Sequence, residues 1–212
     1  MKRLIPIAAA AAIACSAGAT LVKVQVNGTV EYDQFSTGPL AGIPAGSAAS
    51  MSFLLDSNNF VNSQSFPTRG YVIDKDSFSL TMGAKTIGLE NPYPAGQTPY
   101  FVLRNNDPAV DGFFIAENVD FFGGVDTSVA NVDMAFSATY TSSNVLSSLN
   151  ILDAVGSYSL AGISSFNWTL DVGPSSPLGM IYESMTISVV PAPAALALLG
   201  LGGLVGRRRR PC

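Results

Sequence analysis

The sequence predicts an all-β fold, built as a single β-sandwich or jelly-roll-like domain. Short β-rich runs are separated by turn residues along the body of the chain, which is the pattern of sandwiches and barrels. Charged residues make up only 12% of the 212 residues, whereas 48% are hydrophobic and glycine is frequent. No internal repeat and no linker divides the body, so we expect one domain over residues 20–188.

The first run, residues 21–32, alternates polar and apolar side chains and contains Asn27-Gly28, a strong hairpin or bulge signal. The later runs share the same enrichment in branched and aromatic residues and end at Gly, Pro, Asn or Asp. We predict strands at residues 50–56, 69–74, 77–83, 100–105, 111–118, 132–140, 165–172 and 180–190. Residues 144–153 place leucines at helical spacing and predict one short helix or crossover turn.

Composition excludes several chemistries. The chain has no histidine, and its only cysteines are Cys15 and Cys212. Ser-His-Asp and Cys-His catalysis and histidine-ligated metal sites are therefore excluded, and the body has no thiol. Six of the eleven cationic residues lie near the two ends, which leaves five in the body against fifteen acidic residues. A body with a net charge of −10 repels nucleic acid, so we expect no nucleic-acid partner.

The N-terminal segment has the pattern of a secretory signal peptide. Lys2 and Arg3 precede an apolar run over residues 4–15, and Ala17 and Ala19 fit a small-residue cleavage site. We predict a signal-peptide helix over residues 1–19, with cleavage after Ala19 by signal peptidase following export through the translocon. Residues 12–15 also loosely match a lipobox, so lipidation of Cys15 is an alternative.

The C-terminal segment predicts a short transmembrane helix. Residues 187–206 carry no charge and are followed directly by four arginines. A span needs about 20 apolar residues, and the positive-inside rule keeps the arginines cytoplasmic and the body outside. The residues expected to anchor the helix are Leu196, Leu198, Leu199, Leu201 and Leu204. The residues expected to stop transfer and set orientation are Arg207, Arg208, Arg209 and Arg210.

Residues 189–212 as a whole resemble the PEP-CTERM sorting signal. The matching features are Val190, Pro191 and Pro193, then a Leu/Gly-rich helix and the arginine cluster; Ala192 stands where the family usually has Glu. The resemblance implies export by a Gram-negative bacterium and transient anchoring in the inner membrane. It further implies cleavage by exosortase near residues 191–193 and delivery to the cell surface or extracellular matrix. The family's association with exopolysaccharide and biofilm implies a polysaccharide partner.

The acidic residues of the body suggest two kinds of site. Asp107, Asp111 and Asp120 offer oxygen ligands for calcium in a loop-rich region, although no EF-hand spacing is present. Scattered acids are more often solvated surface charge, so we expect no cofactor. A carboxylate pair for glycoside hydrolysis needs no histidine, and Glu31, Glu117 and Glu183 are its candidates.

Two phenylalanine pairs suggest a binding surface. Strand alternation in residues 113–114 and 121–122 places one ring of each pair on each face of a sheet. From these observations we expect a non-catalytic structural or adhesive protein associated with polysaccharide. A secreted carboxylate-dependent glycoside hydrolase and a lipoprotein anchored at Cys15 are the alternatives.

Overall fold

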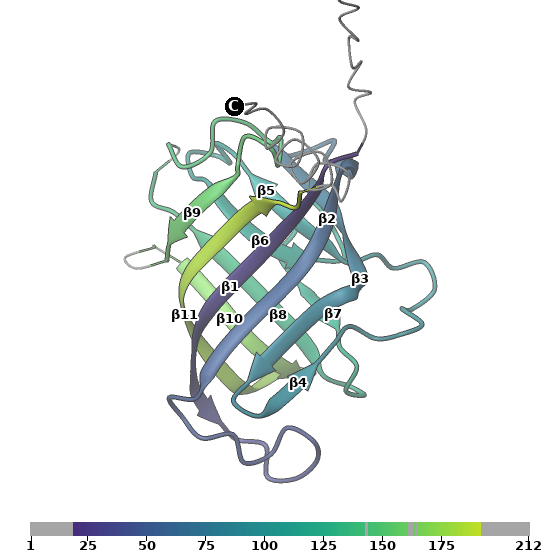
Figure 1. Ribbon diagram of the computed structural model, residues 1–212, viewed down its shortest axis with the longest axis vertical. Coiled ribbons are helices and arrows are strands. Elements are labelled where there is room, and N and C mark those ends of the chain that lie inside the picture. The colour runs from purple at the N-terminus through teal and green to yellow at the C-terminus, as the bar shows by residue number, and fades with distance from the viewer. Residues whose placement is uncertain (1–18, 143, 161–162, 164, 192–212) are drawn as a thin grey trace, which may run out of the picture.

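Eleven antiparallel strands form one continuous sheet in the computed structural model, which describes residues 19–142, 144–160, 163 and 165–191 (Figure 1). The strands are β1 (Leu21–Asp33), β2 (Ala48–Asn62), β3 (Thr68–Met82), β4 (Lys85–Ile87), β5 (Tyr100–Arg104), β6 (Gly112–Ala116), β7 (Gly124–Asp126), β8 (Asp133–Thr139), β9 (Gly156–Ser159), β10 (Ser165–Val172) and β11 (Ser175–Val189).

The sheet closes on itself into a barrel. Its order is β1-β2-β3-β5-β6-β8-β10-β11, and β11 pairs back to β1 from Val22↔Val189 to Asp33↔Leu178. The short strands β4, β7 and β9 pair with β3, β8 and β11, respectively. The predicted all-β class is confirmed, but the strands form one closed sheet instead of the two packed sheets of a sandwich or jelly roll. Closure follows because two long strands from opposite ends of the sequence pair along most of their length.

Strand β1 shows how the sequence pattern produces the barrel wall. Val22, Val24 and Val26 alternate with half-buried polar residues and are fully buried inside the barrel. Strand β1 runs through Asn27 and Gly28 without the predicted hairpin. The register shift occurs opposite them, where Asn27 pairs with Ser184 and Gly28 with Tyr182, so the extra residue lies in β11. A Cβ on Gly28 would lie 2.0 Å from the carbonyl oxygen of Ile181, so only glycine permits this close approach of the two strands.

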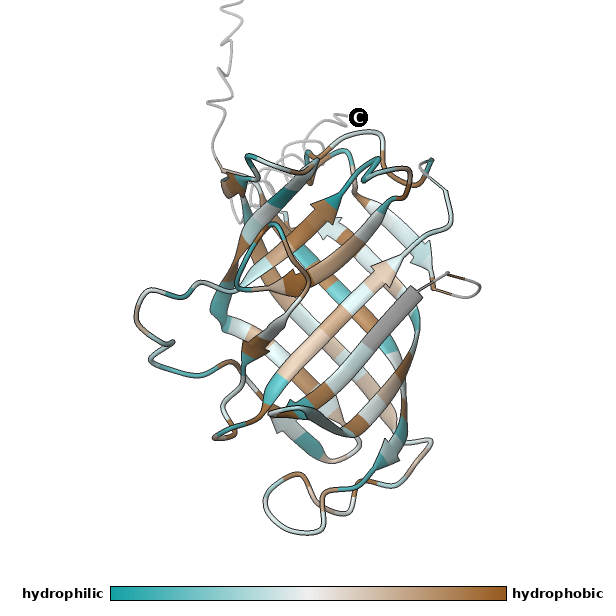
Figure 2. Cartoon of the chain, turned by 180° about the vertical axis from the view of Figure 1, so that it is seen from behind, coloured by the Kyte–Doolittle hydropathy of each residue, from teal (hydrophilic) through white to brown (hydrophobic). Residues whose placement is uncertain are grey.

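The barrel interior is a filled hydrophobic core with many aromatic rings. Phe101 lies between Phe53 and Phe113, with ring centroids 5.4 and 5.8 Å apart. Trp168 and Tyr182 form a second cluster with their ring centroids 5.9 Å apart. Figure 2 shows the matching alternation of hydrophobic and hydrophilic bands along the strands. The inward face of every long strand thus packs into one core.

The chain enters and leaves the barrel at the same end (Figure 1). Val22 lies opposite Val189, and the amide of Val190 donates a hydrogen bond of 2.8 Å to the carbonyl of Leu21. The first three residues of the uncharged segment predicted to form the transmembrane helix, residues 187–206, belong instead to β11, and Ile187 is buried in the core. Residues 192–206 of that segment and residues 1–18 of the predicted signal-peptide helix lie outside the described residues. Within the part of the chain that is described, no helix is long and apolar enough to span a membrane.

The segment predicted to form a helix, residues 144–153, folds as a series of turns. The buried carboxylate of Asp111 accepts hydrogen bonds of 2.7 Å from the amides of both Val145 and Leu146. The hydroxyl of Tyr71 accepts one from the amide of Ile151 and donates one to the carbonyl of Leu149. Side chains of the barrel therefore satisfy the backbone groups that an α-helix would have paired with one another.

We expect Asp111→Asn to lower the free energy of unfolding by about 1.5–3 kcal/mol, the range for hydrogen bonds to charged groups. Asp111 is fully buried, and its second oxygen accepts the amide of Asn106 at 2.9 Å. An asparagine turns an NH₂ group toward one of these three donors. Urea unfolding measures the change. Asp107→Asn, at a half-buried position in the same loop, is the control and should change stability by less than about 0.5 kcal/mol. Equal effects of the two variants would contradict the assignment.

Candidate functional site

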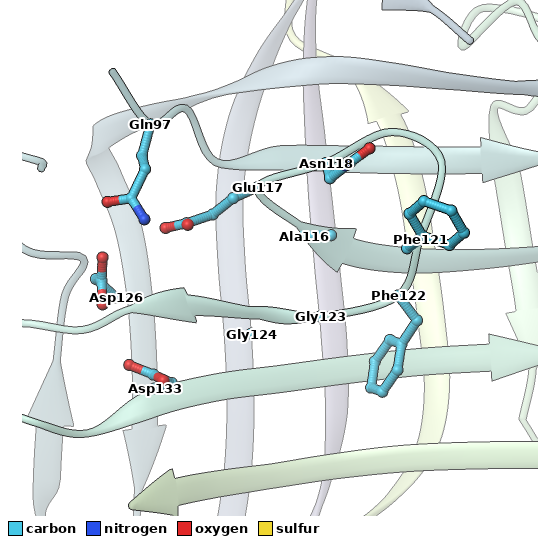
Figure 3. Close-up of a pocket in the computed structure, with 10 residues that line it drawn as sticks. All are labelled: Gln97, Ala116, Glu117, Asn118, Phe121, Phe122, Gly123, Gly124, Asp126 and Asp133. Carbon is cyan, nitrogen blue, oxygen red and sulfur yellow. The ribbon is translucent and has the colours of Figure 1, made fainter. Parts of the chain in front are cut away.

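A cleft of about 370 Å³ opens on the outer wall of the barrel beside β6, β7 and β8 (Figure 3). Its boundary is the loop of residues 117–123, in which Val119 lies against Gly70 of β3. Three outward side chains, Val102, Phe114 and Ala116, form a small buried cluster on the outer face of β5 and β6. The hydroxyl of Thr68 donates a hydrogen bond of 2.7 Å to the carbonyl of Val119. This hydrogen bond and the packing of Val119 against Gly70 hold the loop against the wall.

Three carboxylates from different elements line the cleft. Glu117 follows β6, Asp126 ends β7 and Asp133 begins β8 (Figure 3). Asp126 lies directly opposite Asp133 in the β7–β8 pair, and Asp171 lies opposite Asp133 in the β8–β10 pair. Like charges in direct cross-strand pairs are destabilising. The register of β8 therefore places three aspartates in a row across three strands against their mutual repulsion.

Burial and neighbouring carboxylates raise two pKa values in this cluster. The pKa of Glu117 is raised mainly by burial and also by the charge of Asp126, against a lowering effect of its hydrogen bond with Tyr93. The pKa of Asp133 is raised by burial, by hydrogen bonding with Asp126, and by the charges of Asp126, Glu117 and Asp171. The ionised cluster is thus electrostatically unfavourable in the folded protein.

Tyr93 holds Glu117 in place. Its buried hydroxyl donates a hydrogen bond of 2.5 Å to Glu117 Oε1 and accepts one of 3.1 Å from the amide of Asp126. Burial is the main cause that raises the pKa of Tyr93, so the phenol stays protonated and remains a donor. Lys75 contacts the ring of Tyr93, with Nζ 5.7 Å from its centroid. Tyr93 thereby couples the loop after β6 to the end of β7.

Exposed aromatic rings flank the carboxylates. Phe121 is 61% exposed and Phe122 is 46% exposed, and both line the cleft. Phe66, from the turn between β2 and β3, contacts Phe121 edge to face with ring centroids 5.8 Å apart. Gln97 and Asn118 add amide groups to the same lining (Figure 3). The cleft thus combines apolar ring faces with hydrogen-bonding and acidic groups.

The two phenylalanine pairs differ from the prediction that each would expose one ring. Phe113 and Phe114 lie on opposite faces of β6, as predicted, but both are buried: Phe113 packs in the barrel core and Phe114 packs with Val102 and Ala116 on the outer face. Phe121 and Phe122 are both exposed, because they lie in that loop and not in a strand.

The predicted hydrolase candidates do not meet as a set. Glu31 and Glu183 are exposed on β1 and β11, whereas Glu117 lies in the cleft with Asp126 and Asp133. Sequence reasoning missed Asp133 and Gln97 as site residues, and it considered Tyr93 only among the aromatic residues that could stack on a sugar. The available signal was that Asp126 and Asp133 lie on either side of a turn, as partners in a hairpin do. However, the three-residue strand β7 is too short to show the alternation that identifies a strand.

Two calcium candidates, Asp107 and Asp111, precede β6 and do not line the cleft, whereas Asp120 lies in the loop of residues 117–123 that borders it. Asp111 is engaged by three backbone amides, as described above, and Asp107 lies in the loop before it. One carboxylate oxygen of Asp120 is buried without a hydrogen-bond partner. Over the described ranges, no three acidic or cysteine side chains are placed together to hold a metal ion.

The predicted sorting residues fall at the edge of the described chain. Val190 and Pro191 directly follow β11, and Ala19 is exposed just before β1. Ala192, Pro193, the anchoring leucines, the four arginines, Ala17 and Cys15 lie outside the described residues. Comparison with protein-family models, curated proteins and solved structures found no match to this chain. The chemistry of the site therefore rests on its geometry.

We expect Asp126→Asn to stabilise the protein at neutral pH and to flatten its stability–pH curve. Folding raises the pKa of Glu117 and Asp133 above the ordinary values of 4.5 and 3.8, so the folded state holds more protons than the unfolded state in the range above them. Stability must then fall as pH rises through that range. Asp126→Asn removes a shared cause of both shifts. Thermal unfolding from neutral to mildly acidic pH measures the difference, and parallel curves for the two proteins would contradict it.

Proposed function

We propose that this chain is an exported, non-catalytic polysaccharide-binding protein of a Gram-negative cell surface or extracellular matrix. Its route would run through the translocon, signal peptidase, transient inner-membrane anchoring and exosortase. The cleft beside Phe121 and Phe122 would be its binding site. The observation that carries the binding role is the pairing of exposed ring faces with polar groups in one cleft.

The position of the two tails supports the proposed processing. Both tails join the barrel at one end, at the first and last rungs of the β1–β11 pair. Pro191 has no amide N–H, so the ladder with β1 ends with the hydrogen bond from Val190. Cleavage at residues 191–193 would therefore remove the tail without disturbing the strand that closes the barrel.

The lining of the cleft supports sugar binding. A pyranose ring presents a C–H face and a rim of hydroxyls, which suit an apolar ring face and polar acceptors respectively. Phe121 and Phe122 supply the ring faces, while Glu117, Asn118 and Gln97 supply hydrogen-bonding groups. Because hydrophobic side chains fill the barrel interior, we expect a ligand to bind on the outer wall.

The hydrolase alternative has one observation in its favour. Glu117 has a raised pKa and lies near two further carboxylates, as a general acid would. However, the hydroxyl of Tyr93 already occupies one of its oxygens. Release of new reducing ends from a bound polysaccharide would favour the hydrolase over the binding protein.

We expect mass spectrometry of the exported protein to show an N-terminus at Thr20 and loss of Arg207–Arg210. The chain should be expressed in a Gram-negative host that carries an exosortase. Replacing the four arginines with neutral residues should impair membrane retention before processing, because their charge stops transfer. An intact tail on surface-exposed protein would contradict the proposal, and a lipid on Cys15 would favour the lipoprotein alternative.

We expect Phe122→Ala and Phe121→Ala each to weaken polysaccharide binding by about tenfold, equivalent to about 1.4 kcal/mol. The reason is loss of an exposed stacking face. A glycan array identifies the bound polymer, and calorimetry then compares the variants. Ile181→Ala removes a similarly exposed apolar side chain from β11, where it is 43% exposed, and should leave binding unchanged. An equal loss of polysaccharide binding in all three variants would contradict the assignment of the cleft as the binding site.

A further inference from the structure

Three aspartates form a row across neighbouring strands beside the exposed rings. Asp126, Asp133 and Asp171 are consecutive cross-strand partners. One oxygen of Asp171 is buried without any hydrogen-bond partner. The pKa of Asp133 is raised by burial, by hydrogen bonding with Asp126, and by the charges of Asp126, Glu117 and Asp171. Asp126 and Asp133 make this side of the cleft negatively charged, and the row continues beyond the cleft lining to Asp171.

From this row and the exposed rings, we propose that the bound polysaccharide is an amino-sugar polymer with free, protonated amines, such as a chain of glucosamine units. The inference rests on the proposed polysaccharide-binding function of the same cleft and names its ligand class. The amines would lie along the row from Asp126 to Asp171, while the sugar rings would stack on Phe121 and Phe122.

The extent of the row favours a ligand with several charges. Neighbouring strands lie about 4.8 Å apart, so the backbone positions of Asp126 and Asp171 are separated by about 10 Å. A single metal ion does not match this arrangement, because no three ligating side chains are grouped to hold one among the residues described. A polymer with a positive charge on successive units can reach more than one carboxylate.

Charge complementarity distinguishes acidic, neutral and cationic polysaccharides as ligands. An acidic polymer would be repelled by the body's net charge of −10 and by the row itself. A neutral polymer would leave the repulsion among the aspartates unrelieved. A cationic polymer relieves it, and its amines gain further from an aromatic face, because a cation is attracted to the ring's quadrupole.

The test compares glucosamine oligomers with N-acetylglucosamine oligomers of equal length, using calorimetry on the purified full-length chain in mildly acidic buffer. We expect the glucosamine oligomer to bind at least about tenfold more tightly and to weaken as salt is raised. Asp126→Asn combined with Asp133→Asn should remove about tenfold of that preference. This variant should fold, because it removes repulsion and no hydrogen bond to the backbone. Glu31→Gln, an exposed carboxylate on β1, is the matched control.

The outcomes separate the two proposals. Equal binding of both oligomers, with loss in Phe122→Ala, would overturn the amino-sugar inference while leaving polysaccharide binding in place. A preference that Glu31→Gln reduces as much as the double variant would also overturn it, because attraction would then come from overall charge. Failure of both oligomers and of every neutral and acidic polymer to bind would overturn the proposed function itself.

Discussion

The pairing of β1 with β11 is the constraint on which the rest of the structure depends. It joins the first and last strands of the body from Val22↔Val189 to Asp33↔Leu178, and it converts an eight-strand sheet into a closed barrel. Closure puts the inward side chains of all the long strands into one core, which a body without cysteine needs for stability. The same pairing brings both tails to one end of the barrel. Barrel closure, core packing and the placement of the two chain ends thus share one cause.

The candidate site depends on a second level of pairing. Strand β8 has β6 and β7 on one side and β10 on the other, and its register fixes Asp133 between Asp126 and Asp171. Such a row costs stability in the folded protein. Perturbed carboxylates in a cleft are typical of functional sites, and here they coincide with two exposed phenylalanines held by a packed loop. The site therefore combines repulsion that a ligand can relieve with ring faces that a ligand can cover.

Most of the barrel wall was predictable from alternation, since every predicted strand lies largely within an observed one. The three missed strands, β4, β7 and β9, have only three or four residues and are too short to show a period. Of the two alternatives predicted for residues 144–153, a short helix or a crossover turn, the helix does not form, because Asp111 and Tyr71, distant in sequence, pair with the backbone of this segment. Of the site, Glu117 was predicted from the sequence, but its neighbour Asp133 was not.

The sequence by itself determined the all-β class and the absence of histidine and thiol chemistry from the body, and it carries the patterns from which export and sorting of the tails are predicted. These properties depend on local periodicity and composition, which a linear chain displays directly. Only the tertiary structure decided that the sheet closes, that Phe114 is buried on the outer face of β6, and that Asp126, Asp133 and Asp171 face one another. The physical reason is that alternation tells which face a side chain occupies, whereas the partner strand and its register come from long-range packing.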